Sequence, residues 1–243
     1  MPEKPPRLLV IIPALNEQDA LPGVIREVRS SVPGAHVLVV DDGSTDATRS
    51  RALAEGALVA SLPFNLGVGG AMRTGFRFAL DQGYDIAAQV DADGQHNARD
   101  LKALVNALDG ADVVVGARFA GVGDYKARGP RRWAMVLLAK VLSRVCRTQL
   151  TDATSGFRVA NRQALTVFAY NYPAEYLGDT VEALVIAARA GLRVTQVPVA
   201  MRVRAAGEPS HHPWKATVYL GRAVLALLFA LMRPTSRLKG LPA

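Results

Sequence analysis

Short apolar runs alternate with longer, helix-like segments through the first half of the chain. The runs are rich in Val, Ile, Leu and Ala, and they predict strands at Leu8–Ile12, His36–Val40, Leu58–Ser61, Ile86–Val90 and Asp112–Val115. Helices are expected between them, near Glu17–Ser31, Asp46–Glu55, Gly70–Asp81 and Ala98–Leu108. Strands that alternate with helices are typical of a mostly parallel sheet whose faces are covered by helices. The pattern therefore predicts an α/β fold.

The pattern changes after the fifth predicted strand, where a polar stretch at Gly121–Gly129 precedes a basic amphipathic segment. We expect residues 117–148 to hold a mobile loop followed by a helix over Arg131–Arg147. One face of this helix would carry basic residues and the other apolar ones: Arg132, Lys140, Arg144 and Arg147 against Ala134, Leu137, Leu138, Val141 and Val145. Such a helix can lie in the headgroup layer of an anionic membrane, or pack its apolar stripe on the core. The seven basic and no acidic residues between 126 and 147 favour the membrane.

The C-terminal segment contains a ten-residue apolar run, Ala223–Met232. A helix of that length is about 15 Å long, whereas the hydrocarbon core of a bilayer is about 30 Å thick. No transmembrane span is therefore predicted. We expect a globular domain over residues 1–212 and a C-terminal helix with a basic tail over residues 213–243. The apolar run could lie at a membrane interface, pack on the basic helix, or be buried in a dimer. For the protein as a whole, a homo-oligomer or a membrane-protein partner is left open.

Composition places the chain among globular proteins and indicates anionic partners. Half of the 243 residues are hydrophobic, and the lone Cys146, together with an N-terminus unlike a secretion signal, favours a reducing, cytoplasmic location. The formal net charge of +8 is uneven, because residues 1–125 carry −5 and residues 126–243 carry +13. A basic half attracts nucleic acid, an anionic membrane or phosphorylated substrates. Nucleic acid is disfavoured because only 6% of the residues are aromatic and acidic loops are present.

Two carboxylates follow the fourth predicted strand. In the segment Asp91-Ala92-Asp93-Gly94-Gln95-His96 the two aspartates are two residues apart, and in an extended chain such residues point the same way. They can therefore converge on a hard cation such as Mg²⁺ or Mn²⁺ that carries a pyrophosphate. A solvated Asp-rich turn is the alternative, and it is favoured while the motif stands alone.

A second acidic loop is expected at the same edge of the sheet, since ligands of α/β folds bind beyond the carboxyl ends of the strands. In Asp41-Asp42-Gly43-Ser44-Thr45-Asp46, the first two carboxylates could accept hydrogen bonds from a nucleoside, whereas we expect Asp46 to cap the next helix. The stretch Asn65–Ala71 lacks the third glycine of a dinucleotide fingerprint and follows the third strand. It indicates close approach of the backbone to a phosphate or sugar, or an ordinary flexible loop, rather than a nicotinamide site.

Six motifs follow one another between about residue 8 and residue 210. They are Ile12-Pro13-Ala14-Leu15-Asn16-Glu17, Asp41–Asp46, Asn65 with Gly67, Asp91–His96, Gly116-Ala117-Arg118-Phe119 and Ser155-Gly156-Phe157-Arg158. In this order they resemble the inverting glycosyltransferases of family 2, which have the GT-A fold, and within them the polyprenyl-phosphate (dolichol-phosphate) sugar synthases. The combination favours the metal site over the solvated turn at Asp91 and Asp93. It implies a hexosyltransferase with a mostly parallel sheet flanked by helices and a C-terminal amphipathic helical appendage.

The resemblance also implies roles for individual residues. A nucleotide-diphospho-sugar donor, a GDP- or UDP-sugar, would be bound by Pro13, Leu15, Glu17, Asp42, Gly67, Asp91, Ala92, Asp93 and Arg204. The metal, Mg²⁺ or Mn²⁺, would be held by Asp91, Asp93 and Gln95. The acceptor phosphate would be bound by Arg118 and Arg131, and catalytic contributions are expected from Asp93, Arg118, Arg131 and Arg204.

The implied activity is metal-dependent, inverting transfer of a sugar to a polyprenyl phosphate by a peripheral enzyme at the cytoplasmic face of the membrane. A phosphate acceptor is already anionic near neutral pH, so it needs no general base. The alternative is a family 2 enzyme acting on a soluble or glycan hydroxyl, for which Asp179 or Glu182 would be the available base. Both could instead be first-turn acids of a helix. A non-catalytic nucleic-acid-binding protein is the remaining alternative.

Overall fold

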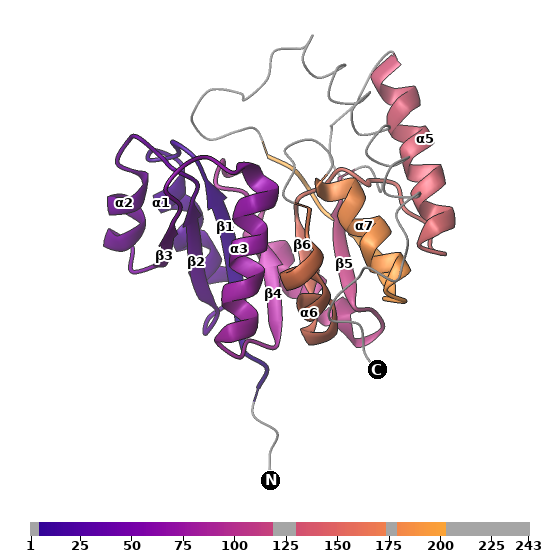
Figure 1. Cartoon of the computed structure of the whole chain (residues 1–243), viewed down its shortest axis with the longest axis horizontal. Helices are drawn as coiled ribbons and strands as arrows, with labels where there is room; N and C mark the ends of the chain where they lie inside the picture. The colour runs from indigo at the N-terminus through magenta and orange to yellow at the C-terminus, as the bar shows by residue number, and fades with distance from the viewer. Residues whose placement is uncertain (1–4, 119–129, 174–178, 203–243) are drawn as a thin grey trace.

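The computed structural model describes residues 5–118, 130–173 and 179–202, which form one sheet between two layers of helices (Figure 1). Within these residues the sheet has seven strands in the order β3-β2-β1-β4-β6-β5-β7. β6 runs antiparallel to β4 and β5, and the other neighbouring pairs are parallel. The strands are β1 (Leu8–Ala14), β2 (His36–Asp41), β3 (Leu58–Ser61), β4 (Ile86–Gln89), β5 (Val113–Ala117), β6 (Arg158–Ala160) and β7 (Val194–Pro198).

The helices cover both faces of the sheet. In Figure 1, α3, α6 and α7 lie on one face, and α5 lies beside α7 at the edge of the molecule. α1 and α4 pack on the other face, where their buried side chains share a core with those of β1. The helices are α1 (Leu21–Ser31), α2 (Thr48–Ala54), α3 (Gly67–Asp81), α4 (Leu101–Asn106), α5 (Pro130–Val145), α6 (Arg162–Asn171) and α7 (Asp179–Arg189), with short 3₁₀ turns at Ala98–Asp100 and Ala107–Asp109.

β1 illustrates why a central strand of this sheet consists of a continuous apolar run. Leu9 and Ile11 point into the core beneath α3 and α6, whereas Val10 and Ile12 point into the core beneath α1 and α4. All four side chains are fully buried. A strand between two helical layers has no solvent face, so it lacks the alternation of polar and apolar residues.

The predicted α/β fold is confirmed. β3 has the predicted bounds, β1 ends two residues later than expected, and β5 begins one residue later and ends two residues later than expected. The sequence analysis did not predict β6, β7 or α6, and it offered a helix at α7 only as the alternative explanation of Asp179 and Glu182, which do lie in the first turn of that helix. β6 is only three residues long and begins with a charged residue, and the apolar run of β7 is interrupted by Thr195 and Gln196.

α5 confirms the expected helix, but the expected separation of a basic face from an apolar face is wrong at Leu137, which is exposed on the same side as Lys140 and Arg144. Leu138 and Leu142 are fully buried and the helix packs on α7, whereas Leu137 is 54% exposed. The helix is therefore partly a core element. The loop expected at Gly121–Gly129 and the C-terminal helix expected over residues 213–243 lie outside the described residues. In the part of the chain that the structure describes, no helix combines the length and apolar character that crossing a bilayer requires.

Candidate functional site

The loops that follow β1 and β2 are joined by hydrogen bonds at one edge of the sheet. The backbone N–H of Asn16 donates to Ser44 Oγ at 2.9 Å, and the Asn16 side-chain oxygen accepts from the backbone N–H of Thr45 at 2.9 Å. The backbone N–H of Glu17 donates to Thr48 Oγ1 at 2.9 Å. A turn occupies residues 18–20, and α1 begins at Leu21 rather than near Glu17 as expected. The two loops together form a preorganised rim.

The predicted nucleoside residues lie on or beside this rim. Pro13 is buried at the end of β1, Leu15 is 37% exposed, and Glu17 is half-buried. Asp46 Oδ1 accepts from the backbone N–H of Thr48, the first residue of α2, at 2.9 Å, but the N-cap position of that helix is held by Ala47 and not by Asp46 as expected. Burial acts to raise the pKa of Asp46, but its hydrogen bonds outweigh burial and hold that pKa below its ordinary value.

Asp42 has a structural partner that the sequence analysis did not foresee. Its two carboxylate oxygens accept from the backbone N–H groups of Leu66 and Gly67, at 2.7 and 2.8 Å. These groups start α3, which explains why α3 begins three residues earlier than predicted. Burial raises the pKa of the Asp42 carboxyl, against the lowering effect of the two hydrogen bonds. Asp42 thus fixes the N-terminus of α3, and its contact with a nucleoside stays a prediction.

The carboxylates of Asp91 and Asp93 lie just beyond the carboxyl end of β4. Gln89 Nε2 donates to Asp91 Oδ1 at 3.1 Å, and Asp93 Oδ1 accepts from the backbone N–H of Gln95 at 3.0 Å. The Asp91 side chain is 38% exposed, and Ala92 between the two aspartates is buried. A positive φ of 76° at Gly94 turns the chain back after Asp93.

The donor set fits a small divalent cation that also binds substrate. Among the described residues, no group of three or more His, Cys, Asp or Glu side chains is placed to bind a metal ion. Two carboxylates and an amide oxygen are nevertheless hard ligands, and Mg²⁺ is usually bound through one or two carboxylates together with substrate phosphates. Asp91, Asp93 and Gln95 therefore suit a cation that arrives with a diphosphate rather than a permanently caged one.

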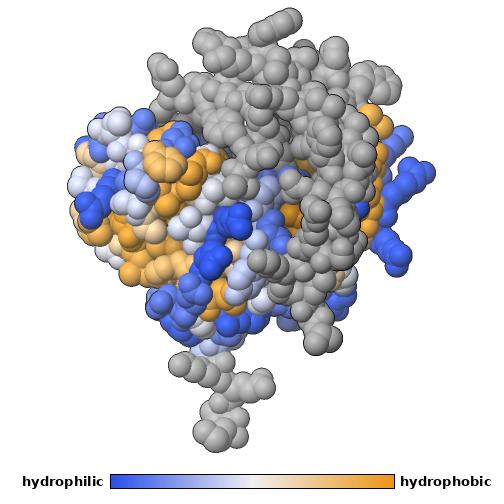
Figure 2. Space-filling model, viewed as in Figure 1, coloured by the Kyte–Doolittle hydropathy of each residue, from blue (hydrophilic) through white to orange (hydrophobic). Residues whose placement is uncertain are grey.

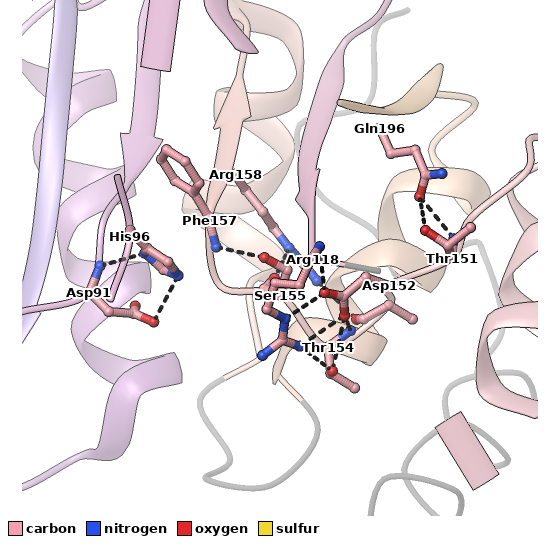
Figure 3. Close-up of polar contacts among 11 residues, drawn as sticks. Asp91, His96, Arg118, Thr151, Asp152, Thr154, Ser155, Phe157, Arg158 and Gln196 are labelled. Atoms are coloured by element: carbon pink, nitrogen blue, oxygen red, sulfur yellow. Dashed lines mark hydrogen bonds and ion pairs between the residues drawn. The ribbon is translucent and has the colours of Figure 1, made fainter. Parts of the chain in front are cut away.

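His96 contacts Asp91 twice, although no role was predicted for it. Its Nδ1 accepts from the backbone N–H of Asp91 at 3.1 Å, and its Nε2 lies 3.5 Å from Asp91 Oδ2 (Figure 3). The ring is buried and stacks on Phe157, with ring centroids 4.8 Å apart. The sequence placed His96 in the motif Asp91–His96, which could have marked it as a site residue. Its stacking on Phe157 could not be predicted, because Phe157 lies in another part of the chain.

Arg118 is paired with a buried carboxylate. Its guanidinium makes a two-pronged ion pair with Asp152 and also donates to Thr154 Oγ1 at 2.7 Å (Figure 3). Burial acts to raise the pKa of Asp152, but the Arg118 guanidinium outweighs burial and holds that pKa below its ordinary value. The predicted role of Arg118 toward an acceptor phosphate stays a prediction, and such a phosphate would compete with Asp152. The side chain of Arg131 and all of Arg204 lie outside the described residues.

Arg158 joins the loop before β6 to the start of α7. Its guanidinium donates to the backbone carbonyls of Ser155, Thr180 and Ala153, at 2.8, 2.8 and 3.2 Å. Asp179, the first residue of α7, is electrostatically coupled to both Arg158 and Asp91. Burial raises the pKa of Asp179, and Arg158 lowers it only in part. Both candidate bases, Asp179 and Glu182, lie in the first turn of α7.

The chain resembles characterised sugar transferases over most of its length. It is 34% identical over 212 residues to the undecaprenyl-phosphate mannosyltransferase of Micrococcus luteus, an alignment that covers 83% of this chain and 86% of that protein. It is 36% identical over 167 residues to the polyprenol monophosphomannose synthase of Mycolicibacterium smegmatis, covering 65% and 63%.

Solved structures show the same fold. Glucosyl-3-phosphoglycerate synthase from Mycobacterium tuberculosis, in complex with Mn²⁺, UDP and phosphoglyceric acid, superposes with a TM-score of 0.71 at 25% identity, covering 95% of this chain and 80% of that one. The GT-A fold expected from the motifs is thereby confirmed. The family model for glycosyl transferase family 2 matches residues 9–168, which include the rim loops, the Asp91–His96 motif and the Arg118–Asp152 pair. On the strength of that match and of these relatives, the chain belongs to glycosyl transferase family 2 and is a glycosyltransferase.

Proposed function

We propose that this enzyme transfers a sugar from a GDP- or UDP-sugar to a polyprenyl phosphate, with inversion, in a reaction that needs Mg²⁺ or Mn²⁺. The observation that carries the proposal is the half-buried pair Asp91 and Asp93 at the carboxyl end of β4, beside the rim formed by the loops after β1 and β2. Relatives named for transfer of mannose to polyprenyl phosphates support the acceptor class. The Mn²⁺ and UDP in the solved neighbour support a divalent metal with a nucleotide donor.

Each part of the site has a task in this reaction. Pro13, Leu15 and Glu17 lie where a nucleoside would rest, and the tie between Asn16 and Ser44 keeps that loop in place without the donor. Asp91, Asp93 and Gln95 would hold the metal, which supplies positive charge to the diphosphate as it leaves. The acceptor phosphate is anionic before the reaction, so this chain need only bind and orient it.

The outward face of α5 supports binding to a membrane surface, where such an acceptor is found. Val136 is 41% exposed and Leu137 is 54% exposed, and Lys140 and Arg144 project from the same side of the helix. Figure 2 shows apolar and strongly hydrophilic residues side by side at the edge of the molecule that α5 occupies. Apolar residues flanked by cations suit the interface of an anionic bilayer. We therefore place the enzyme at the cytoplasmic face of the membrane as a peripheral protein.

One observation favours a second candidate, transfer to a hydroxyl. Burial raises the pKa of Asp179, and a carboxylate with a raised pKa near a metal motif is suited to accept a proton from a hydroxyl nucleophile. Asp179 would then act as the base. Asp179 is also the first residue of α7, next to Thr180, whose carbonyl accepts from Arg158. This structural place explains the position of Asp179 equally directly.

A comparison of three acceptors, each offered separately, tests the proposal. The protein is incubated with Mn²⁺, radiolabelled GDP-mannose or UDP-glucose, and one of three acceptors: undecaprenyl phosphate in detergent, phosphoglyceric acid, or a simple sugar. We expect label to enter the lipid phase only with undecaprenyl phosphate and only in the presence of metal. Transfer to phosphoglyceric acid or to the simple sugar, with none to the lipid, would refute the acceptor assignment.

A further inference from the structure

The Asp91 carboxylate is enclosed by groups from three parts of the chain. Gln89 Nε2 donates to Oδ1 at 3.1 Å, and His96 Nε2 lies 3.5 Å from Oδ2. The backbone at Gly156 closes the remaining protein side, because a Cβ added there would lie 3.1 and 3.2 Å from the two carboxylate oxygens. We call Gln89, His96 and Gly156 the Asp91 cradle. The exposed part of the Asp91 side chain is what the cradle leaves open.

The hydrogen bonds determine which nitrogen of His96 carries the proton. A backbone N–H can only donate, so the Nδ1 that accepts from Asp91 is unprotonated. The neutral ring therefore carries its proton on Nε2, the nitrogen that faces Asp91 Oδ2. The ring is held in this orientation because it is 3% exposed and stacks on Phe157 with planes 15° apart. His96 thus accepts a hydrogen bond from the Asp91 backbone and places its Nε2 3.5 Å from the Asp91 carboxylate.

Gly156 is needed for space and not for its backbone conformation. Its φ is outside the left-handed region, so alanine could adopt the same backbone. A methyl group there would nevertheless lie 2.9 Å from Gln89 Nε2 as well as against both oxygens of Asp91. These contacts are shorter than ordinary van der Waals distances, so either the carboxylate or the Gln89 amide must move. The glycine allows β6, which is antiparallel to β4, to bring its preceding loop against the carboxylate.

We propose that Gly156 and His96 are positioning residues that hold the Asp91 carboxylate in one orientation before metal and donor bind. The proposal rests on the proposed function, in which Asp91 is a metal ligand. A ligand oriented in advance loses less freedom on binding, and partners behind metal ligands typically change metal affinity by about 10–100-fold when they are removed. The cradle therefore sets the affinity for the metal rather than the intrinsic rate of sugar transfer.

The test is a titration with Mn²⁺, both alone and with UDP or GDP present, in which free Mn²⁺ is followed by its electron paramagnetic resonance signal. Gly156→Ala should weaken Mn²⁺ binding at least about 10-fold. The matched control is Gly110→Ala, a site where an added Cβ has no neighbour within 4 Å and the φ is also negative. His96→Phe keeps a ring to stack on Phe157 but loses both nitrogens, and it should weaken binding similarly. His96→Asn should recover part of the loss, because its amide oxygen can accept in place of Nδ1.

A kinetic measurement separates positioning from damage to the fold. In Gly156→Ala and His96→Phe, raising the Mn²⁺ concentration should restore turnover, since the defect is in metal affinity. Wild-type affinity for Mn²⁺ in both variants would overturn this inference and leave the proposed function standing. A turnover defect that no Mn²⁺ concentration relieves would also overturn it. If the wild-type protein itself bound no Mn²⁺, even with UDP or GDP present, the proposed metal-dependent function would fail and the inference with it.

Discussion

Replacing Asp152 with asparagine should destabilise the protein strongly, although the change is nearly isosteric. The Asp152 side chain is completely buried, and it accepts from both the side chain and the backbone N–H of Arg118. Removing one partner of a buried ion pair costs about 3–5 kcal/mol because the other charge is left uncompensated. Arg118 is 19% exposed, so water relieves part of this cost, and we expect a loss near the lower end, about 3 kcal/mol. For a chain of this size that corresponds to a fall in Tm of about 6–12 °C.

The assay is chemical denaturation at pH 7, with Asp109→Asn as the control because Asp109 is exposed. The pH dependence provides a second check. Because the pKa of Asp152 is lowered in the folded protein, its contribution is complete above the ordinary carboxyl value of 3.8 and is lost as the pH falls through the lowered folded pKa. The difference in unfolding free energy between wild type and Asp152→Asn should therefore shrink only in strong acid.

A double-mutant cycle with Arg118→Gln identifies the source of the effect. If the ion pair is responsible, the double variant should be much more stable than the sum of the two single losses predicts. Equal unfolding free energies for Asp152→Asn and Asp109→Asn at pH 7 would refute the reasoning. In that case Arg118 would not depend on Asp152, and its guanidinium would be available for an acceptor phosphate.

Three further outcomes are expected. Asp91→Asn should remain folded, as judged by circular dichroism, and lose metal-dependent turnover; full activity would contradict the metal-site assignment. Arg131→Ala should raise KM for a polyprenyl phosphate far more than KM for the nucleotide sugar, and equal increases would argue against its placement at the acceptor. Replacing Lys140, Arg144 and Arg147 with Glu should release the protein from anionic liposomes in a sedimentation assay, since each cation near such a surface contributes about 1 kcal/mol. Failure of the wild-type protein to sediment with anionic liposomes at low salt would show that α5 does not bind membranes.

The sequence alone determined those features that depend on neighbouring residues. The apolar runs of β1 and β4 became strands in which every residue is buried, because both faces of the sheet are covered at its centre. Asp91, Asp93 and Gln95 lie within five positions of one another, so their common location follows from chain geometry once β4 is assigned. The order of the six motifs was equally visible, and it led to the family that the comparisons confirm.

The tertiary structure decided which distant residues meet at the site. Arg118 was predicted as an acceptor ligand from its own motif, but its partner Asp152 is known only once the loop before β6 is placed beside the end of β5. Gly156 reaches Asp91 only because β6 inserts antiparallel between β4 and β5, and three residues of strand carry no periodicity from which that insertion could be inferred. Local pattern specifies which residues must be buried, whereas contacts between loops depend on which strands become neighbours. That choice is made by the packing of the whole sheet.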